Sequence, residues 1–256
     1  MLSTLGTRAR GGEHDLDACG RRRGRCRAVD EGVCEGVRMS DRPWQPWAAA
    51  TVLALTVLQL VVGTFGGLDQ FEGKGFGYRL AAYPVLMLIV PAAWWWRTRN
   101  DPATSANALP WGAFALIMAP FLIDVTGNTL DLYDTIDPWD NINHFVNWML
   151  LLWGCGLLVA RADVRPRWLL VVGITGLGAI LAIGWEIGEW YTFIRRGTEL
   201  DGAYEDTLSD ELLGTLGAFV AALIVDRTAA RRTPDGRRQI SRRRASDRAE
   251  RPWSAR

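Results

Sequence analysis

The stretch "DTIDPWDNINHFVNWMLLLWGCGLLVA", Asp134 to Ala160, decides the fold class because an acidic segment runs directly into a long apolar one. The apolar part is close to the roughly 20 residues that a helix needs to cross a bilayer. Elsewhere in the chain the apolar residues again gather into long blocks instead of being spread evenly. The sequence therefore predicts an all-α, multi-pass membrane protein.

Six segments are expected to cross the membrane as helices. They are Trp47–Phe65, Leu80–Trp96, Pro110–Ile123, Ile142–Ala160, Trp168–Trp190 and Leu208–Val225. The third segment is short and contains Pro120, which predicts a kink or a local thinning of the bilayer. The expected architecture is a bundle of six transmembrane helices over residues 43–226.

The distribution of arginine predicts the orientation of this bundle, because loops on the cytoplasmic side are enriched in Lys and Arg. Arginines precede the first span, follow the second, follow the fourth and follow the sixth, which are all on one side. Loops on the other side are acidic or mixed, with Arg195 and Arg196 as an exception. Both termini are therefore expected in the cytoplasm.

Both ends of the chain are polar and rich in arginine. Residues 1–42 contain no apolar run that resembles a signal peptide and are expected to be a disordered tail. An abrupt change of composition at Met39 suggests the alternative that translation begins there. Residues 227–256 are expected to form a disordered cytoplasmic tail. Its arginine series has no interleaved aromatic residues for base stacking, so no nucleic-acid partner is expected.

Three polar motifs are predicted to lie on the side opposite these arginines. The first is Asp140-x-x-x-His144, whose spacing of four places both side chains on one face of the fourth span. Asp140 can hold one imidazole nitrogen and leave the other for a proton, a metal or a substrate. The local alternative is that Asp140 caps the helix N-terminus.

The second and third motifs bring carboxylates to the ends of the fifth and sixth spans. "GWEIGEWY" contains Glu186 and Glu189 at a depth where an unpaired ionisable side chain costs about 2–3 kcal/mol. "AYEDTLSDELLGTLGA" contains Asp206 and Asp210, and two glycines that follow them permit close helix contact. The local alternatives are solvated acids at a helix end and a cap formed by Asp206 or Thr207.

Since the three motifs are expected at one membrane face, we hypothesise that they line a shared acidic cavity, which Asp124, Asn128 and Glu205 could join. Repulsion among carboxylates at low dielectric is relieved by protonation, by a nearby arginine or by a cation. Oxygen ligands with one imidazole suit Mg²⁺, Mn²⁺ or Ca²⁺, with Zn²⁺ as an alternative. The candidate catalytic residues are His144, Asp140 and Glu186, and the candidate cation ligands are Glu186, Glu189, Asp206 and Asp210.

At these motifs the sequence resembles the YjdF-like family of small bacterial membrane proteins and, more distantly, the VanZ-like proteins. The resemblance is an ordered series: Asp140-x-x-x-His144-Phe, then Glu186-x-x-Glu189-Trp, then Asp-Thr-x-x-Asp ending in Leu-Gly-Ala. VanZ-like proteins tend to have Glu-x-x-Gln in the middle motif and Asn where Gly214 stands, so the YjdF-like pattern is closer. The resemblance implies a multi-pass protein of the bacterial cytoplasmic membrane and names no reaction.

Three functions are compatible with these features. The first is an extracytoplasmic enzyme that hydrolyses or transfers a group on a lipid or envelope precursor, with His144 as base or cation ligand. The second is a non-catalytic membrane scaffold in which the acids hold helices together by hydrogen bonds. The third is a proton- or cation-coupled transporter, which is disfavoured because the carboxylates cluster at one end and no inverted repeat is evident. Membrane lipids are expected partners in each case.

Overall fold

The computed structural model describes residues 44–99, 109–162, 164–192, 194–196 and 202–232, and within these ranges the chain is helical without any strand. Six helices there are long and apolar enough to cross a membrane, which confirms the predicted fold class. They are α2 (Gln45–Phe65), α3 (Phe76–Thr98), α5 (Trp111–Thr129), α7 (Trp139–Val159), α8 (Trp168–Thr192) and α9 (Ala203–Arg232). The short helices between them are η1 (Asp69–Phe71), α6 (Leu132–Thr135), η2 (Ala160–Ala162) and η3 (Ile194–Arg196).

The third span is longer than its hydropathy indicated. The apolar run ends near Ile123, but α5 continues to Thr129 through Asp124 and Asn128. The helix tolerates these polar residues because both are paired. Asn128 Nδ2 donates a hydrogen bond to the backbone carbonyl of Asp124 at 3.0 Å, and the Asp124 carboxylate lies 2.6 Å from a guanidinium nitrogen of Arg79.

The local capping interpretation of the acidic motifs is wrong. Helix α7 begins at Trp139 with no side-chain cap, and Asp140 lies in its first turn, where a carboxylate favours the positive end of the helix dipole. Helix α9 begins at Ala203, so Asp206 and Thr207 lie inside the helix and not at its N-cap. Asp140, Asp206 and Thr207 therefore do not serve as N-caps.

The sixth span also extends past its expected end at Val225, since α9 is helical to Arg232. Ala229 and Ala230 are strong helix formers and extend it. The expected disordered region over residues 1–42, the start at Met39 and the tail beyond residue 232 lie outside the described residues.

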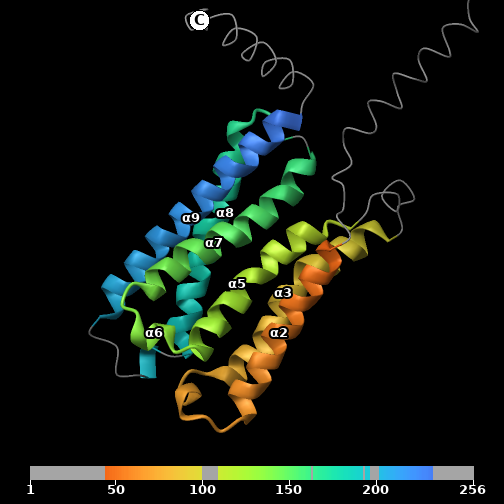
Figure 1. The fold of residues 1–256 in the computed structure, drawn as a ribbon. Helices are drawn as coiled ribbons and strands as arrows, with labels where there is room; N and C mark the ends of the chain where they lie inside the picture. The colour runs from red at the N-terminus through yellow and green to blue at the C-terminus, as the bar shows by residue number, and fades with distance from the viewer. Residues whose placement is uncertain (1–43, 100–108, 163, 193, 197–201, 233–256) are drawn as a thin grey trace, which may run out of the picture. The chain divides into compact units, whose positions relative to one another are not determined.

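The spanning helices form two groups of three that meet at α5 and α7 (Figure 1). In one group α7, α8 and α9 pack against one another, and in the other α2 contacts both α3 and α5. The interior of the first group is an apolar cluster that includes Leu152, Ile174, Ala218 and Val225. This apolar packing holds the helices that carry the three polar motifs.

Close approach of α9 to α7 depends on glycine. A Cβ atom at Gly217 would meet the backbone carbonyl of Phe145 and lie 3.0 Å from the backbone nitrogen of Met149. A Cβ atom at Gly214 would lie 2.7 Å from the Trp148 ring. The close contact expected of this glycine face is confirmed, and its partner is α7. Such contacts matter in a bilayer because van der Waals packing drives helix association there.

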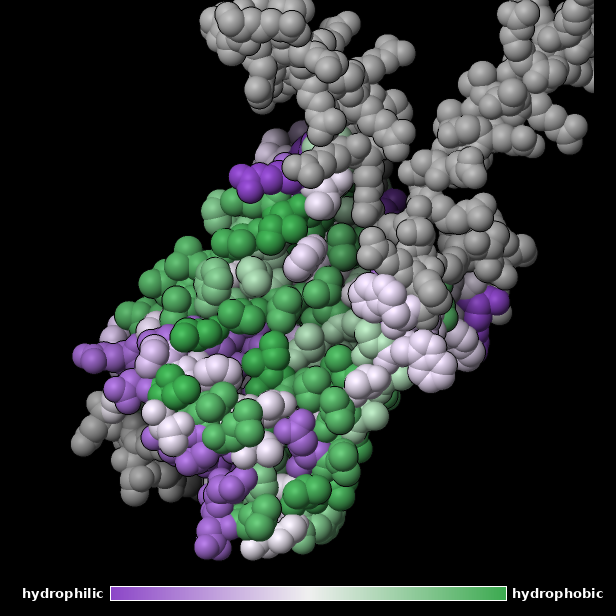
Figure 2. Space-filling model, viewed as in Figure 1, coloured by the Kyte–Doolittle hydropathy of each residue, from purple (hydrophilic) through white to green (hydrophobic). Residues whose placement is uncertain are grey.

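The acidic motifs and the arginine-rich loops lie at opposite ends of the helices. Large apolar side chains are exposed along α2, α3 and α8, as expected for helices in contact with lipid. On the face shown in Figure 2, apolar residues cover much of the helices and most hydrophilic residues gather toward their ends. Which end faces the cytoplasm stays a prediction from the arginines.

Gly217→Ala is expected to destabilise the protein by about 1–3 kcal/mol, because the added methyl group would overlap backbone atoms of α7 that cannot rotate away. Unfolding of the purified protein in mixed detergent, followed by circular dichroism, measures the change. Gly176→Ala on α8 is the matched control, because a Cβ atom there meets nothing within 4 Å and alanine favours helix. Equal stability of the two variants would contradict the close packing of α7 and α9.

Candidate functional site

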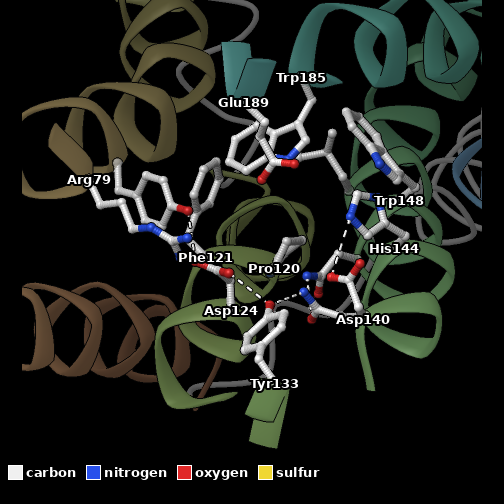
Figure 3. Close-up of a pocket in the computed structure, with 14 residues that line it drawn as sticks. Arg79, Pro120, Phe121, Asp124, Tyr133, Asp140, His144, Trp148, Trp185 and Glu189 are labelled. Carbon is white, nitrogen blue, oxygen red and sulfur yellow. Dashed lines mark hydrogen bonds and ion pairs between the residues drawn. The ribbon is translucent and has the colours of Figure 1, made fainter. Parts of the chain in front are cut away.

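A cavity of about 110 Å³ lies between α3, α5, α7 and α8, near the end of the helices that carries the acidic motifs (Figure 3). We call it the acidic cavity. Apolar rings form part of its wall, among them Phe121, Trp148 and Trp185. Its ionisable and phenolic lining residues are Arg79, Tyr83, Asp124, Tyr133, Asp140, His144 and Glu189.

His144 is surrounded by carboxylates from three helices. Its Nε2 atom lies 3.5 Å from Oδ2 of Asp210 and 3.7 Å from Oδ1 of Asp140. Its Nδ1 atom lies 3.8 Å from Oε1 of Glu186. His144, Glu186 and Asp210 are only 8%, 5% and 2% exposed. Packing of α7, α8 and α9 therefore places one imidazole and two carboxylates in a shared buried cluster, with Asp140 at its more exposed side.

These separations are longer than the roughly 2.7–3.2 Å of an N–H···O hydrogen bond. Nδ1 of His144 and Oδ1 of Asp210 are buried atoms without a hydrogen-bond partner. Two groups of side chains have ligand atoms within 4.8 Å of one another. The first, which we call the Asp140 set, consists of Asp140, His144 and Asp210. The second, the Glu189 set, consists of His144, Glu186 and Glu189.

Either set has ligand types that could hold a cation, with ligand atoms within 4.8 Å of one another. Metal–ligand bonds of about 2.0–2.2 Å place neighbouring ligand atoms about 3.0–3.4 Å apart. The observed distances of 3.5–3.8 Å around His144 are slightly larger, so a small inward movement would fit the ligands to a cation. Carboxylate and imidazole together are ligands that Mn²⁺ and Zn²⁺ accept, and carboxylates alone suit Mg²⁺.

The carboxylate of Asp124, by contrast, is already paired. One of its oxygens accepts hydrogen bonds from Arg79 at 2.6 Å and from the Tyr83 hydroxyl at 2.7 Å. Its other oxygen accepts a hydrogen bond from the Tyr133 hydroxyl at 2.9 Å. The side chains of Arg79 and Asp124 are 15% and 14% exposed, so this ion pair is largely buried. Asp124 therefore belongs to a structural network on the wall of the cavity.

Tyr133 connects that network to α7. Its hydroxyl donates to Asp124 and accepts a hydrogen bond from the Asn143 amide, and Asn147 donates to Oδ1 of Asn143 at 2.7 Å. Burial and the neighbouring Asp124 charge raise the pKa of Tyr133, so the hydroxyl keeps the proton that it donates. Asn143 precedes His144 in the chain, and the network thus anchors the turn of α7 that carries the imidazole.

The structure brings together some, but not all, of the candidate residues expected from the sequence. Asp206 and Glu205 are exposed on the first turns of α9, and neither belongs to either set. Asn128 is buried behind the cavity wall, where it bonds to Asp124. The candidates that lie around the imidazole are Asp140, His144, Glu186, Glu189 and Asp210.

Sequence reasoning missed two basic residues at this end of the bundle. Arg79 lies in the first turn of α3 and pairs with Asp124, and a single arginine at the edge of an apolar span could have indicated such a buried partner. Lys74 lies 2.5 Å from Asp134, and this hydrogen bond lowers the pKa of Asp134. Because both cations are paired with acids, they add little to the positive charge of this end.

Comparison with known proteins identifies a family without an assigned function. The family described as "Predicted membrane protein (DUF2238)" has a model that matches residues 46–231. It is the family of the YjdF-like proteins, so that resemblance is confirmed, whereas the link to VanZ-like proteins stays a prediction. No curated protein and no solved structure matches the chain.

Asp124→Asn is expected to destabilise the protein by about 3–5 kcal/mol, because it removes the carboxylate that pairs with the largely buried Arg79 guanidinium. Asp134→Asn, which breaks the exposed pair with Lys74, is the matched control and should cost about 0–1 kcal/mol. Detergent unfolding of both variants measures the difference. Similar losses in the two variants would show that the buried pair does not hold the cavity wall.

Proposed function

The chain belongs to the DUF2238 family of predicted membrane proteins, and we propose that it is a cation-dependent membrane enzyme. In this proposal a divalent cation bound at His144 polarises a phosphate or carbonyl oxygen, or activates water, for hydrolysis or group transfer on a lipid or envelope precursor. One observation carries the proposal: the buried imidazole faces carboxylates from three helices without a hydrogen bond to any of them.

The Asp140 set is the better cation site of the two. Its imidazole–carboxylate distances are 3.5 and 3.7 Å, and Asp210 has a second buried oxygen, Oδ1, without a hydrogen-bond partner. With the cation on Nε2, Nδ1 carries the proton and faces Glu186 at 3.8 Å. A metal-bound histidine commonly donates its second N–H to a carboxylate, which fixes the ring and strengthens the ligand.

This arrangement leaves room for chemistry. Three protein ligands leave positions on the cation for water and substrate, as in catalytic zinc sites. Glu189 lines the same cavity and makes no bond to the cation in this arrangement, so it is the proposed general base. The arginine-rich loops at the opposite end of the helices support an extracytoplasmic position for the site, in the cytoplasmic membrane of a bacterium.

A scaffold is the second candidate, and the network around Asp124 favours it. That network joins α3, α5, α6 and α7 through hydrogen bonds and needs no ligand. A transporter ranks third. The space between α7, α8 and α9 beyond the site is filled by the apolar cluster of Leu152, Ala218 and Val225, which gives an ion no polar path there.

Purified protein is expected to retain about one divalent cation per chain, measured by elemental mass spectrometry after dialysis. His144→Ala and Asp210→Asn should lose it, since each removes a direct ligand. Glu186→Gln should weaken affinity about 10–100-fold, as expected of a carboxylate that orients a ligand. Asp206→Asn, an exposed acid one turn away on the same helix, is the matched control and should keep the cation.

Two other results would replace this proposal. Wild-type protein that binds no Mg²⁺, Mn²⁺ or Zn²⁺, together with a large loss of stability in His144→Ala, would favour the scaffold. Proton-linked uptake into vesicles that disappears in Asp206→Asn would favour the transporter. Circular dichroism and gel filtration of each variant separate loss of cation from loss of fold.

A further inference from the structure

A second cavity, of about 250 Å³, lies between α3 and α8 and shares four residues with the acidic cavity. We call it the α3–α8 groove. The shared residues are Arg79, Tyr83, Trp185 and Glu189. The remaining residues that form its walls are Tyr78, Ala82 and Leu86 on α3 and Gly184, Gly188 and Thr192 on α8.

The walls of the groove are two stripes of residues spaced four apart on antiparallel helices. Tyr78 lies in the first turn of α3 and Leu86 two turns further along, a distance of roughly 12 Å along the helix. Half of a bilayer's hydrocarbon core is about 15 Å thick, so the groove spans most of one leaflet. The wall formed by α8 borders open space, because Cβ atoms at Gly184 and Gly188 would meet no atom within 4 Å.

We propose that the α3–α8 groove binds an acyl chain of a membrane phospholipid and presents its head group to the acidic cavity. The proposal rests on the proposed function only for the reaction at the head group, and binding in the groove stands on its own geometry. It names the substrate class of that function as a lipid that reaches the site sideways from the bilayer.

The polarity of the groove fits an amphiphile. Its polar residues, Arg79, Glu189 and Thr192, lie at the end of the helices, whereas Leu86 and Gly184 form its deeper, apolar end. Both walls belong to helices that can span a membrane, so lipid chains border the groove on its open side.

Two aromatic rings separate the groove from the acidic cavity. The ring centroids of Tyr83 and Trp185 lie 6.2 Å apart, and both residues line both cavities. The hydrogen bond from Tyr83 to Asp124 holds the tyrosine ring in place. Figure 3 shows Trp185 and Glu189 together at one edge of the acidic cavity, and because Glu189 lines both cavities, a head group at this edge would lie beside the acidic cavity.

The test fills the groove from each wall separately. Gly188→Leu on α8 and Ala82→Phe on α3 place side chains in the path of the acyl chain. Gly176→Leu and Ala81→Phe are the matched controls, since both positions are exposed on the same helices and neither lines the groove. Native mass spectrometry counts phosphatidylglycerol retained by each full-length protein after purification in detergent.

Wild type and both controls are expected to retain about one lipid per chain, and either groove variant about tenfold less, equivalent to losing the contacts of about two methylenes. Equal retention in all five proteins would overturn the proposal. So would binding of glycerol phosphate as tight as that of the full lipid, since the acyl chain would then contribute nothing.

The cation content of the same samples separates this proposal from the proposed function. Groove variants that lose lipid and keep the cation support a lipid site distinct from the cation ligands. If wild type holds no cation, the lipid count still decides whether the groove binds an acyl chain.

Discussion

The buried ion pair between Arg79 and Asp124 is the interaction on which this end of the bundle depends. An unpaired charge within membrane-spanning helices costs about 2.5–3.5 kcal/mol or more, so each partner requires the other. Two tyrosine hydroxyls complete the pairing, and one of them continues through Asn143 into α7. These hydrogen bonds join helices that are distant in sequence around one cavity.

The side chains around His144 are paired differently from the Asp124 carboxylate. If the carboxylates among them served only to hold helices together, they would be expected to be hydrogen-bonded as Asp124 is. Instead, a ring nitrogen of His144 and an oxygen of Asp210 are buried without partners. Each unsatisfied buried polar atom costs about 1–3 kcal/mol, a cost that a bound cation or a protonated water network would remove. This cost supports the proposed cation site.

The sequence was sufficient to predict the spans and the three polar motifs, but not the rotation and extent of each helix. Apolar length located the six helices, yet it ended the third span at Ile123, whereas α5 continues through Asp124, which pairs with Arg79, 45 positions away. Spacing of four placed Asp206 and Asp210 on one face, but only Asp210 lies deep enough to be covered by α7 and α8. How deeply a residue is buried along its helix depends on how the neighbouring helices pack, and the sequence spacing of the residues does not reveal this. The roles of Arg79 and Tyr133 could not be predicted for a similar reason, because both depend on pairing with Asp124 through the tertiary fold.

The two cavities together favour hydrolysis or group transfer on a lipid over a reaction on a soluble compound. Asp140 remains 40% exposed, which gives water a route to the cation ligands from the polar end of the bundle. The α3–α8 groove opens on the lipid side and meets the same cavity at Tyr83 and Trp185. A reaction between water and a lipid head group needs both routes to converge on one set of ligands. A soluble substrate would need only the first of these routes.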